Sequence, residues 1–455
     1  MPPPLASLIT LGFIAFLFRS DHRESSGITR ALWIPLLWLL VIVSKPVAVW
    51  LQILFGLQWG EAVSADSIVW ITLIIAGARV LARRGVTVSE IVRTNRFLSA
   101  FVLYCFISVF WSDSLFWSFK HWIATLGHPI MALIILTEPD PKKALICLMK
   151  RGAYVAIPVS ILLIRYYAQW GRSFSSWTGE AQKSGFASDK NSLGVICMIF
   201  GFFFIWHSLN MLRVERSKAK KRELFWCAAF LLMIGYLFRG LNCGTALVSL
   251  SVAAMTVAVI GLPQVNKRYI GAYFVTGIVI WSIGELIFGL TDTLLAFLGK
   301  DPTLTQRTEM WSELLKFDIN PILGAGYDSF WQGERLEVLW ERHWWKPNEA
   351  HNGYLETYLN LGLVGLSLLA GWMVTIYRKC RLDLFRDVEI GLFGLGTLTM
   401  ALLYNWTEAG FKTLSPVYFL CYVISMEYRR PQLTPVEQWP EEIRLEDEKL
   451  AHIDA

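Results

Sequence analysis

Residues 192–239 read SLGVICMIFGFFFIWHSLNMLRVERSKAKKRELFWCAAFLLMIGYLFR. Two apolar runs, 192–208 and 223–239, flank the basic segment RVERSKAKKR at 213–222. A helix that crosses a membrane needs about 20 mostly apolar residues, and connections rich in lysine and arginine remain in the cytoplasm. The stretch therefore predicts two membrane-spanning helices that are joined by a cytoplasmic loop.

The composition of the whole chain is typical of a membrane protein. Of the 455 residues, 55% are hydrophobic and 17% are charged, and there are 21 tryptophans and 28 phenylalanines. Soluble domains carry more charge, whereas aromatic side chains are enriched where helices meet lipid headgroups. The chain has seven cysteines, and this odd number does not predict a disulfide framework. No two of them fall at metal-ligand spacing, so no zinc site is predicted. The net charge of +6 is modest, and no nucleic-acid partner is indicated.

Apolar runs of this kind recur along the chain. They predict an all-α polytopic membrane protein with about 12–13 transmembrane helices and a large exoplasmic loop that contains short amphipathic helices. We interpret the first run as a retained span rather than a signal peptide, because its arginines follow the apolar residues. The expected spans are residues 3–18, 31–44, 66–82, 97–111, 119–136, 145–163, 192–208, 223–239, 244–261, 270–290, 353–377, 389–404 and 413–427.

The connections between the spans alternate in basic residues, and this alternation predicts the orientation. Connections assigned to the cytoplasm hold 28 of the 42 lysines and arginines, and those on the other side hold 14. Residues 1–428 are thus expected to form one membrane domain with two exoplasmic loops, a smaller one at 164–191 and a larger one at 291–352. Residues 429–455 are expected to form an acidic cytoplasmic tail.

The larger outer loop supplies the first candidate site residue. Residues 303–317 are expected to form a short amphipathic helix with Arg307 in its first turn. The free N–H groups of a helix N-terminus favour anions, and a guanidinium matches phosphate oxygens. The alternative is that Arg307 forms a surface ion pair with Asp301 or Glu309.

The smaller outer loop supplies the second candidate. Lys190 and Asn191 end the polar turn GFASDKN and lie at the outer mouth of the span at 192–208. Lys190 could extend to the lipid headgroups, which is the commoner fate of such a lysine. Alternatively, it faces inward and helps to neutralise a phosphate.

The stretch EAHNGYLETYLNLGLVG at 349–365 supplies the third candidate, His351. The spacing of His351, Leu355, Tyr358 and Gly362 predicts that they share one helical face. Imidazole can take or give a proton near neutral pH, although a lone histidine is more often structural. No His, Asp or Glu lies at metal-ligand spacing from it, so no metal is expected. The sequence also lacks a serine-nucleophile motif and a glycine-rich phosphate-binding loop.

Four stretches, taken together and in order, carry a resemblance to a known family. They are GFASDKN (185–191), QRTEMW (306–311), NPILGAGYDSFW (320–331) and AHNGYLETYLNLGLVG (350–365), with weaker support from LWIPLLWLLVIVSKP (32–46) and FWSDSLFWSFK (110–120). The chain resembles the O-antigen ligase and Wzy-type polymerase superfamily, and within it the exopolysaccharide polymerases of the succinoglycan type.

The resemblance implies a metal-independent, membrane-embedded glycosyltransferase without a cofactor, whose donor is a glycan on undecaprenyl pyrophosphate. By their positions in the motifs, Arg307 is expected to hold the pyrophosphate and His351 to act as base on the acceptor hydroxyl. Trp311 and Asn352, which lie near them in sequence, are expected to contact the substrate. Attack opposite the departing pyrophosphate would invert the anomeric centre.

One stretch departs from the family pattern. Many ligases carry an arginine after the eighth span, where this chain has Gly244 in CGTALVSL (243–250). If a second cation is needed for the pyrophosphate, Arg239, Lys190 or Arg172 must supply it. The departure favours a polymerase over a ligase.

The sequence leaves three functions open. The first is a polymerase of lipid-linked repeat units in the bacterial inner membrane, with its site on the periplasmic side. The second is a ligase that transfers the finished glycan to lipid A-core. The third is a transporter of the same lipid, which is less favoured because transporters place charges within their spans. The expected partners are the lipid-linked glycan, membrane lipids and, for a polymerase, chain-length regulators and export proteins.

Overall fold

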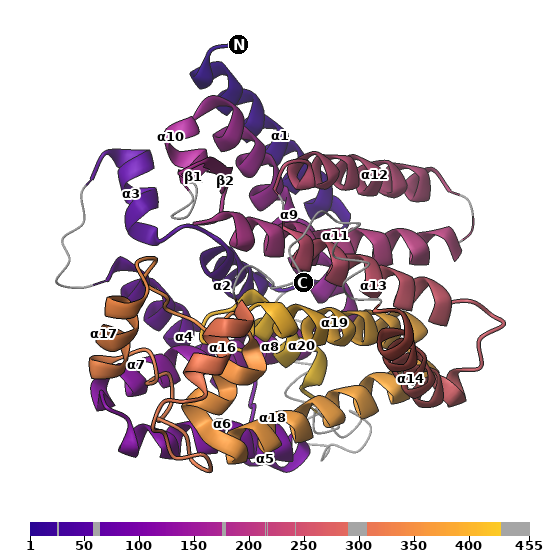
Figure 1. Cartoon of the computed structure of the whole chain (residues 1–455). Coiled ribbons are helices and arrows are strands. Elements are labelled where there is room, and N and C mark those ends of the chain that lie inside the picture. Colours follow the sequence, from indigo (N-terminus) through magenta and orange to yellow (C-terminus); the bar gives the residue numbers. More distant parts are fainter. Residues whose placement is uncertain are drawn as a thin grey trace, which may run out of the picture.

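The computed structural model describes residues 1–24, 27–57, 64–174, 179–213, 215, 217–241, 243–289 and 307–428. The expected tail at 429–455 and the beginning of the larger loop lie outside these residues, and so does Asp301, the alternative partner of Arg307. The described chain is almost entirely helical (Figure 1).

The helices follow one another with short connections. The first part contains α1 (Pro3–Glu24), α2 (Trp33–Val43), α3 (Val47–Phe55), α4 (Ala65–Arg83), α5 (Val88–Thr94), α6 (Arg96–Ile107), α7 (Leu115–Thr125), α8 (Gly127–Leu136), α9 (Pro141–Tyr166), α10 (Ala168–Gly171) and α11 (Lys190–Arg213). The second part contains α12 (Lys218–Phe238), α13 (Gly244–Ile260), α14 (Ile270–Phe288), α16 (Arg307–Leu314), α17 (Gly333–Arg342), α18 (Gly353–Arg386), α19 (Val388–Thr407) and α20 (Pro416–Ser425). The short 3-10 helices of the described ranges are η1 (Arg30–Leu32), η2 (Ser108–Trp111) and η3 (Lys267–Tyr269).

The described strands, β1 (Arg172–Phe174) and β2 (Ala181–Lys183), form an antiparallel hairpin in the smaller outer loop.

The prediction of an all-α polytopic membrane protein is confirmed. Eight helices of the described chain are long and apolar enough to cross a membrane, or up to ten if each of two bent helix pairs counts as one span. The bent pairs are 30–43 with 47–55, at 92°, and 88–94 with 96–111, at 111°. Each of the expected apolar runs coincides with helical residues, although α13 and α20 are shorter than a full span and α12 begins inside the basic segment.

The two ends of the helix bundle differ in charge. In Figure 1 the β hairpin, α3, α16 and α17 lie toward the left of the view, whereas the end of α11, the start of α12 and the connection from α13 to α14 lie toward the right. The basic segment at 213–222 includes the end of α11 and the start of α12, and the positive-inside rule predicts a cytoplasmic location for it.

Large apolar side chains fill the interior of the bundle. On α11, Phe200, Phe203 and Trp206 are completely buried, as expected for a span surrounded by other spans. A second, smaller apolar cluster lies at the outer end of α18, and its members are Met310, Leu314, Ala325, Phe330, Trp331, Leu339, Ala350 and Leu359. The described part of the larger loop therefore forms a folded unit with its own core.

A break in α18 joins this unit to the membrane domain. Gly362, with φ 62° and ψ −163°, is not helical. The segment 320–326 lies against the break, where the N–H of Leu363 donates to the carbonyl of Pro321 over 2.9 Å and the N–H of Gly326 donates to the carbonyl of Asn360 over 2.8 Å. These bonds satisfy backbone groups that the break would otherwise leave unpaired inside an apolar helix.

Glycine is required on both sides of this contact. Gly324 also has a positive φ, of 74°, and a Cβ added to it would lie 2.5 Å from the backbone of Asn360. A Cβ added to Gly362 would lie 2.3 Å from the carbonyl oxygen of Ile322. The two segments approach more closely than any side chain permits, which explains Gly324 and Gly362.

Replacing Gly324 by alanine is expected to lower the thermal stability of the detergent-solubilised protein, because the new methyl group forces the two backbones apart at a cost of roughly 1–3 kcal/mol. Gly333→Ala is the matched control, since Gly333 also has a positive φ, of 62°, but has open space around its Cβ position. Fluorescence-detected size-exclusion melting curves compare the two variants. Equal melting temperatures would contradict the close approach.

Two details expected from the sequence are wrong. The helix of the larger loop ends at Leu314, not at 317. His351 does not share a helical face with Gly362, because α18 begins only at Gly353, His351 itself has a φ of 48°, and the helix is broken at Gly362.

Candidate active site

Arg307, at the start of α16, is tied to the outer end of α19. Its guanidinium lies 3.0 Å from Oε1 of Glu408 and also donates to the carbonyl of Thr407. The side chain of Glu408 is 6% exposed and that of Arg307 is 19% exposed. A buried carboxylate is stable only when it is paired and hydrogen-bonded, so Glu408 fixes the position of the guanidinium.

Glu408 also contacts His351. Nδ1 of His351 lies 3.2 Å from Oε2 of Glu408 and 3.0 Å from Oε1 of Glu349. The ring is one third exposed. The structure thus brings Arg307 and His351 together through a single carboxylate.

The neighbouring carboxylates change the protonation of His351. Burial by itself lowers the pKa of this imidazole, but its hydrogen bonds to Glu349 and Glu408 and their negative charges outweigh burial and raise the pKa to about 9. For Glu349, burial opposes ionisation, but the ion pair with Lys412 and the contact with His351 hold its pKa well below the usual range. At neutral pH, His351 is therefore an imidazolium between two carboxylates.

The cations of this group keep donors that no described residue uses. Arg307 uses two of its five N–H donors, Lys412 uses one of three, and His351 uses only its Nδ1 proton. Arg307, His351 and Lys412 contact Glu408 and Glu349, and the charges of Glu356 and Asp328 also act on Lys412. The arrangement is suited to bind an anion such as a phosphate.

Glu349, His351 and Glu408 offer ligand atoms within 4.8 Å of one another, a geometry that could hold a metal ion. However, Arg307 and Lys412 already contact the two carboxylates, and two fixed cations would repel a divalent ion. The charges around the three residues fit an anion better than a metal.

Lys190 is the first residue of α11, and it forms no ion pair within the described residues. Its neighbour Asn191 contacts the group of Arg307, Glu408 and His351, because the side-chain amide of Asn191 donates to Oε1 of Glu408 over 3.4 Å. The turn before them is fixed by the buried Lys45, whose ammonium donates to the carbonyl of Ala187. The outer mouth of α11 therefore borders the candidate site.

Arg172 and Arg239 lie in a separate basic cluster. Lys183 is opposite Arg172 in the β hairpin, and its ammonium donates to the carbonyl of Arg239 over 2.6 Å. Burial and the positive charges of Arg172, Arg239 and Arg165 lower the pKa of Lys183. Among the described residues, no hydrogen bond or ion pair joins this cluster to the group around Glu408.

Trp311 and Asn352 hold the backbone next to His351. The indole N–H of Trp311 donates to the carbonyl of Ala350 over 2.7 Å. The side-chain oxygen of Asn352 accepts the N–H groups of Tyr354 and Leu355 and so caps α18. Both contacts constrain the backbone on either side of the strained histidine.

Sequence reasoning missed Glu408 and Lys412 as site residues, and it noted Glu349 only as a neighbour of His351. Glu408 and Lys412 belong to the short connection between α19 and α20, which carries no motif that points to phosphate chemistry. Their place in an outer connection was the available signal, and it did not distinguish them from other exposed charges.

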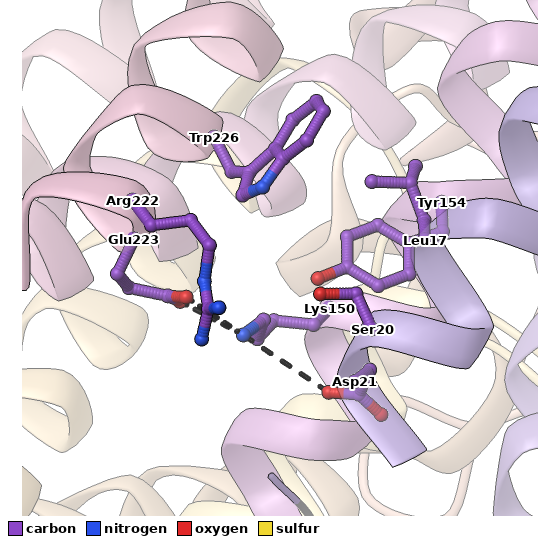
Figure 2. A pocket seen from close by; sticks show the side chains of 8 residues that line it. All are labelled: Leu17, Ser20, Asp21, Lys150, Tyr154, Arg222, Glu223 and Trp226. Carbon is purple, nitrogen blue, oxygen red and sulfur yellow. Dashed lines mark hydrogen bonds and ion pairs between the residues drawn. The ribbon is translucent and has the colours of Figure 1, made fainter. Parts of the chain in front are cut away.

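A second group of buried charges joins the C-terminal end of α1 to the N-terminal parts of α9 and α12. Figure 2 shows Lys150 between Glu223 and Asp21, with Trp226 above them. Nζ of Lys150 lies 2.8 Å from Glu223, which also accepts from His207 over 2.8 Å. His207, Glu223 and Cys227 could in principle hold a metal ion, but the ammonium of Lys150 already neutralises the carboxylate. The group ties α1 to the bundle.

Two comparisons with known proteins agree with the motifs. Residues 228–370 match the family model described as O-antigen ligase. Over 361 residues the chain is 27% identical to the exopolysaccharide production protein ExoQ of Rhizobium meliloti (strain 1021). The aligned region covers 75% of this chain and 79% of that protein. The matched family segment contains Arg307 and His351 and ends before Glu408 and Lys412. The resemblance predicted from the motifs is confirmed.

Proposed function

Because the comparisons support an O-antigen ligase and Wzy-type family for this multi-pass membrane protein, we propose that it transfers a glycan from a lipid diphosphate to a sugar hydroxyl. The reaction is the joining of undecaprenyl-pyrophosphate-linked repeat units into an exopolysaccharide at the outer face of the bacterial inner membrane. The observation that carries this proposal is the cationic group of Arg307, His351 and Lys412 on the buried Glu408 and the half-buried Glu349.

The cationic group would stabilise the leaving diphosphate. When the bond between the anomeric carbon and the phosphate oxygen breaks, negative charge grows on that oxygen. Positioned donors that meet this charge in a partly buried site lower the barrier without having to reorganise. Arg307 offers a planar pair of donors, and Lys412 offers a mobile point charge.

His351 works in its protonated form in this proposal. The resemblance implied a base on the acceptor hydroxyl, but an imidazole with a pKa of about 9 carries a proton at neutral pH. Its Nε2–H can then donate to the diphosphate while Nδ1–H remains on the carboxylates. Asn191 and Lys190, at the mouth of α11, border the space for the same anion.

The rate of transfer is expected to fall as the pH rises through about 9, because His351 then loses the proton that the diphosphate requires. Between neutral pH and that value, His351 should not limit the rate. The measurement is the initial rate of glycan transfer in proteoliposomes across this range. A rate that instead rises toward pH 9 and then levels off would identify neutral His351 as the working form.

Purified protein supplied with lipid-diphosphate-linked repeat units alone tests the reaction. We expect a ladder of glycans on gel electrophoresis, an inverted anomeric centre by NMR, and no loss of activity when EDTA is added. A product that forms only after lipid A-core is added would show a ligase. Movement of the lipid between leaflets without any new glycosidic bond would show a transporter.

A further inference from the structure

The basic cluster of Arg165, Arg172, Lys183 and Arg239 lies where the C-terminal ends of α9 and α12 meet the β hairpin. Lys183 is opposite Arg172 in the hairpin, and its ammonium donates to the backbone carbonyl of Arg239 over 2.6 Å. Arg165 and Lys183 both approach the ring of Tyr236, with 5.9 Å and 5.6 Å between the charged group and the ring centroid. One aromatic ring thus brings together cations from separate elements of the chain.

The charges within this cluster are all positive. None of its four side chains forms an ion pair with a residue that the structure describes. Burial, followed by the positive charges of the three arginines, lowers the pKa of Lys183. Glu180, the acidic residue of the hairpin, is exposed and is not among the charges that act on Lys183. Like charges repel one another, so an anion bound among the four cations would stabilise the cluster.

The cluster is also unusual for its side of the membrane. Lysine and arginine are depleted in the connections that leave the cytoplasm, and only 14 of the 42 in this chain are predicted on the outer side. Four of those 14 gather in the basic cluster. Such a concentration against the general trend indicates a local role for the positive charge.

Next to the cluster, α12 presents an apolar stripe to its surroundings. The exposed residues of this stripe are spaced by 3, 4, 4 and 3 positions and so share one side of the helix; they are Phe225, Ala228, Leu232, Tyr236 and Arg239. Leu232 is 76% exposed and Phe225 is 63% exposed. From Phe225 to Tyr236 the helix rises about 16 Å, roughly half the thickness of the hydrocarbon layer. Since tyrosine is enriched at the boundary with the headgroups, the cluster is expected at the depth of lipid phosphates.

From this geometry we propose that the basic cluster binds the headgroup phosphate of an anionic phospholipid in the outer leaflet. The acyl chains lie along the stripe of α12, and the phosphate lies among the four cations beside Tyr236. Guanidinium groups match the geometry of phosphate oxygens, and basic residues near the membrane surface attract anionic lipids.

A phospholipid fits this place better than the lipid diphosphate of the proposed reaction. Within the described ranges, no hydrogen bond or ion pair joins the cluster to the group around Glu408, and that group has its own cations for a diphosphate. The three arginines of the cluster are exposed, so a lipid can reach them from the bilayer and exchange. A reacting diphosphate instead requires a site that excludes water. The inference therefore does not depend on the proposed reaction.

The double variant Arg165→Gln/Arg239→Gln tests the site. Both side chains are exposed, and the carbonyl to which Lys183 donates belongs to the backbone, so the variant should fold. We expect it to bind phosphatidylglycerol roughly 25-fold more weakly, about fivefold for each cation removed. The measurement is native mass spectrometry of the purified protein as the concentration of phosphatidylglycerol is raised. Arg165→Lys/Arg239→Lys keeps both charges and should bind within a few fold of the wild type.

Lys316→Gln/Arg342→Gln is the matched control, because it removes two exposed cations from the larger outer loop and should bind phosphatidylglycerol like the wild type. Equal weakening in both glutamine variants would overturn the proposal, and so would a wild type that retains phosphatidylglycerol no better than zwitterionic phosphatidylcholine. Weaker binding of undecaprenyl diphosphate, with unchanged binding of phosphatidylglycerol, would also overturn it and assign the cluster to the substrate. None of these measurements requires glycan transfer, so the proposed function is tested separately.

Discussion

Replacing Arg307 by alanine is expected to reduce glycan transfer about 10³-fold, the loss seen when a positioned donor to a developing negative charge is removed. The guanidinium is held by Glu408 and by the carbonyl of Thr407, and no residue that the structure describes uses its remaining N–H groups. Arg307→Lys is expected to retain little of the activity, because the point charge of an ammonium cannot bind Glu408 and a phosphate in the planar geometry of a guanidinium. The measurement is the rate of polymer formation by purified variants at equal protein concentration.

Arg342→Ala controls for the loss of an outer arginine. Arg342 lies at the end of α17, is 60% exposed and pairs with Glu313 at the surface. Exposed ion pairs contribute little, so this variant should retain full activity. Comparable losses in both variants, with both proteins correctly inserted, would mean that Arg307 acts only through the general charge of the outer surface.

Glu408→Gln is expected to lower the transfer rate roughly 10²-fold, the cost of misplacing catalytic groups by about an ångström. Glutamine has the same size but no charge, so it no longer neutralises Arg307 or His351. The pKa of His351 is raised in part by Glu408, and its loss should therefore move the alkaline limb of the pH profile to lower pH. The measurement is the rate of polymer formation as a function of pH.

Glu341→Gln is the matched control for this variant. Glu341 is an exposed carboxylate on α17, outside the contacts of the candidate site. It should change neither the rate nor the pH profile. An alkaline limb that stays in place in Glu408→Gln would show that Glu408 does not set the protonation of His351.

The sequence alone determined the helical membrane architecture, and it predicts an orientation. Hydropathy and the distribution of lysine and arginine are local properties, so the apolar runs and the basic segment at 213–222 predicted the helical membrane fold without any knowledge of packing. The motifs also singled out Arg307 and His351, which the structure brings together. They could not give the break at Gly362, because it depends on a backbone contact with Pro321 and Ile322.

The tertiary structure decided the chemistry of the site. Glu408 contacts Arg307 across 101 positions of the chain and His351 across 57. Pairings over such separations are fixed by the packing of α16, α18 and α19, which no local pattern encodes. The charge state of His351 follows from these pairings, since burial alone lowers its pKa and two carboxylates reverse that effect. The sequence shows which residue types are present, whereas the electrostatic environment of the site residues exists only in the folded chain.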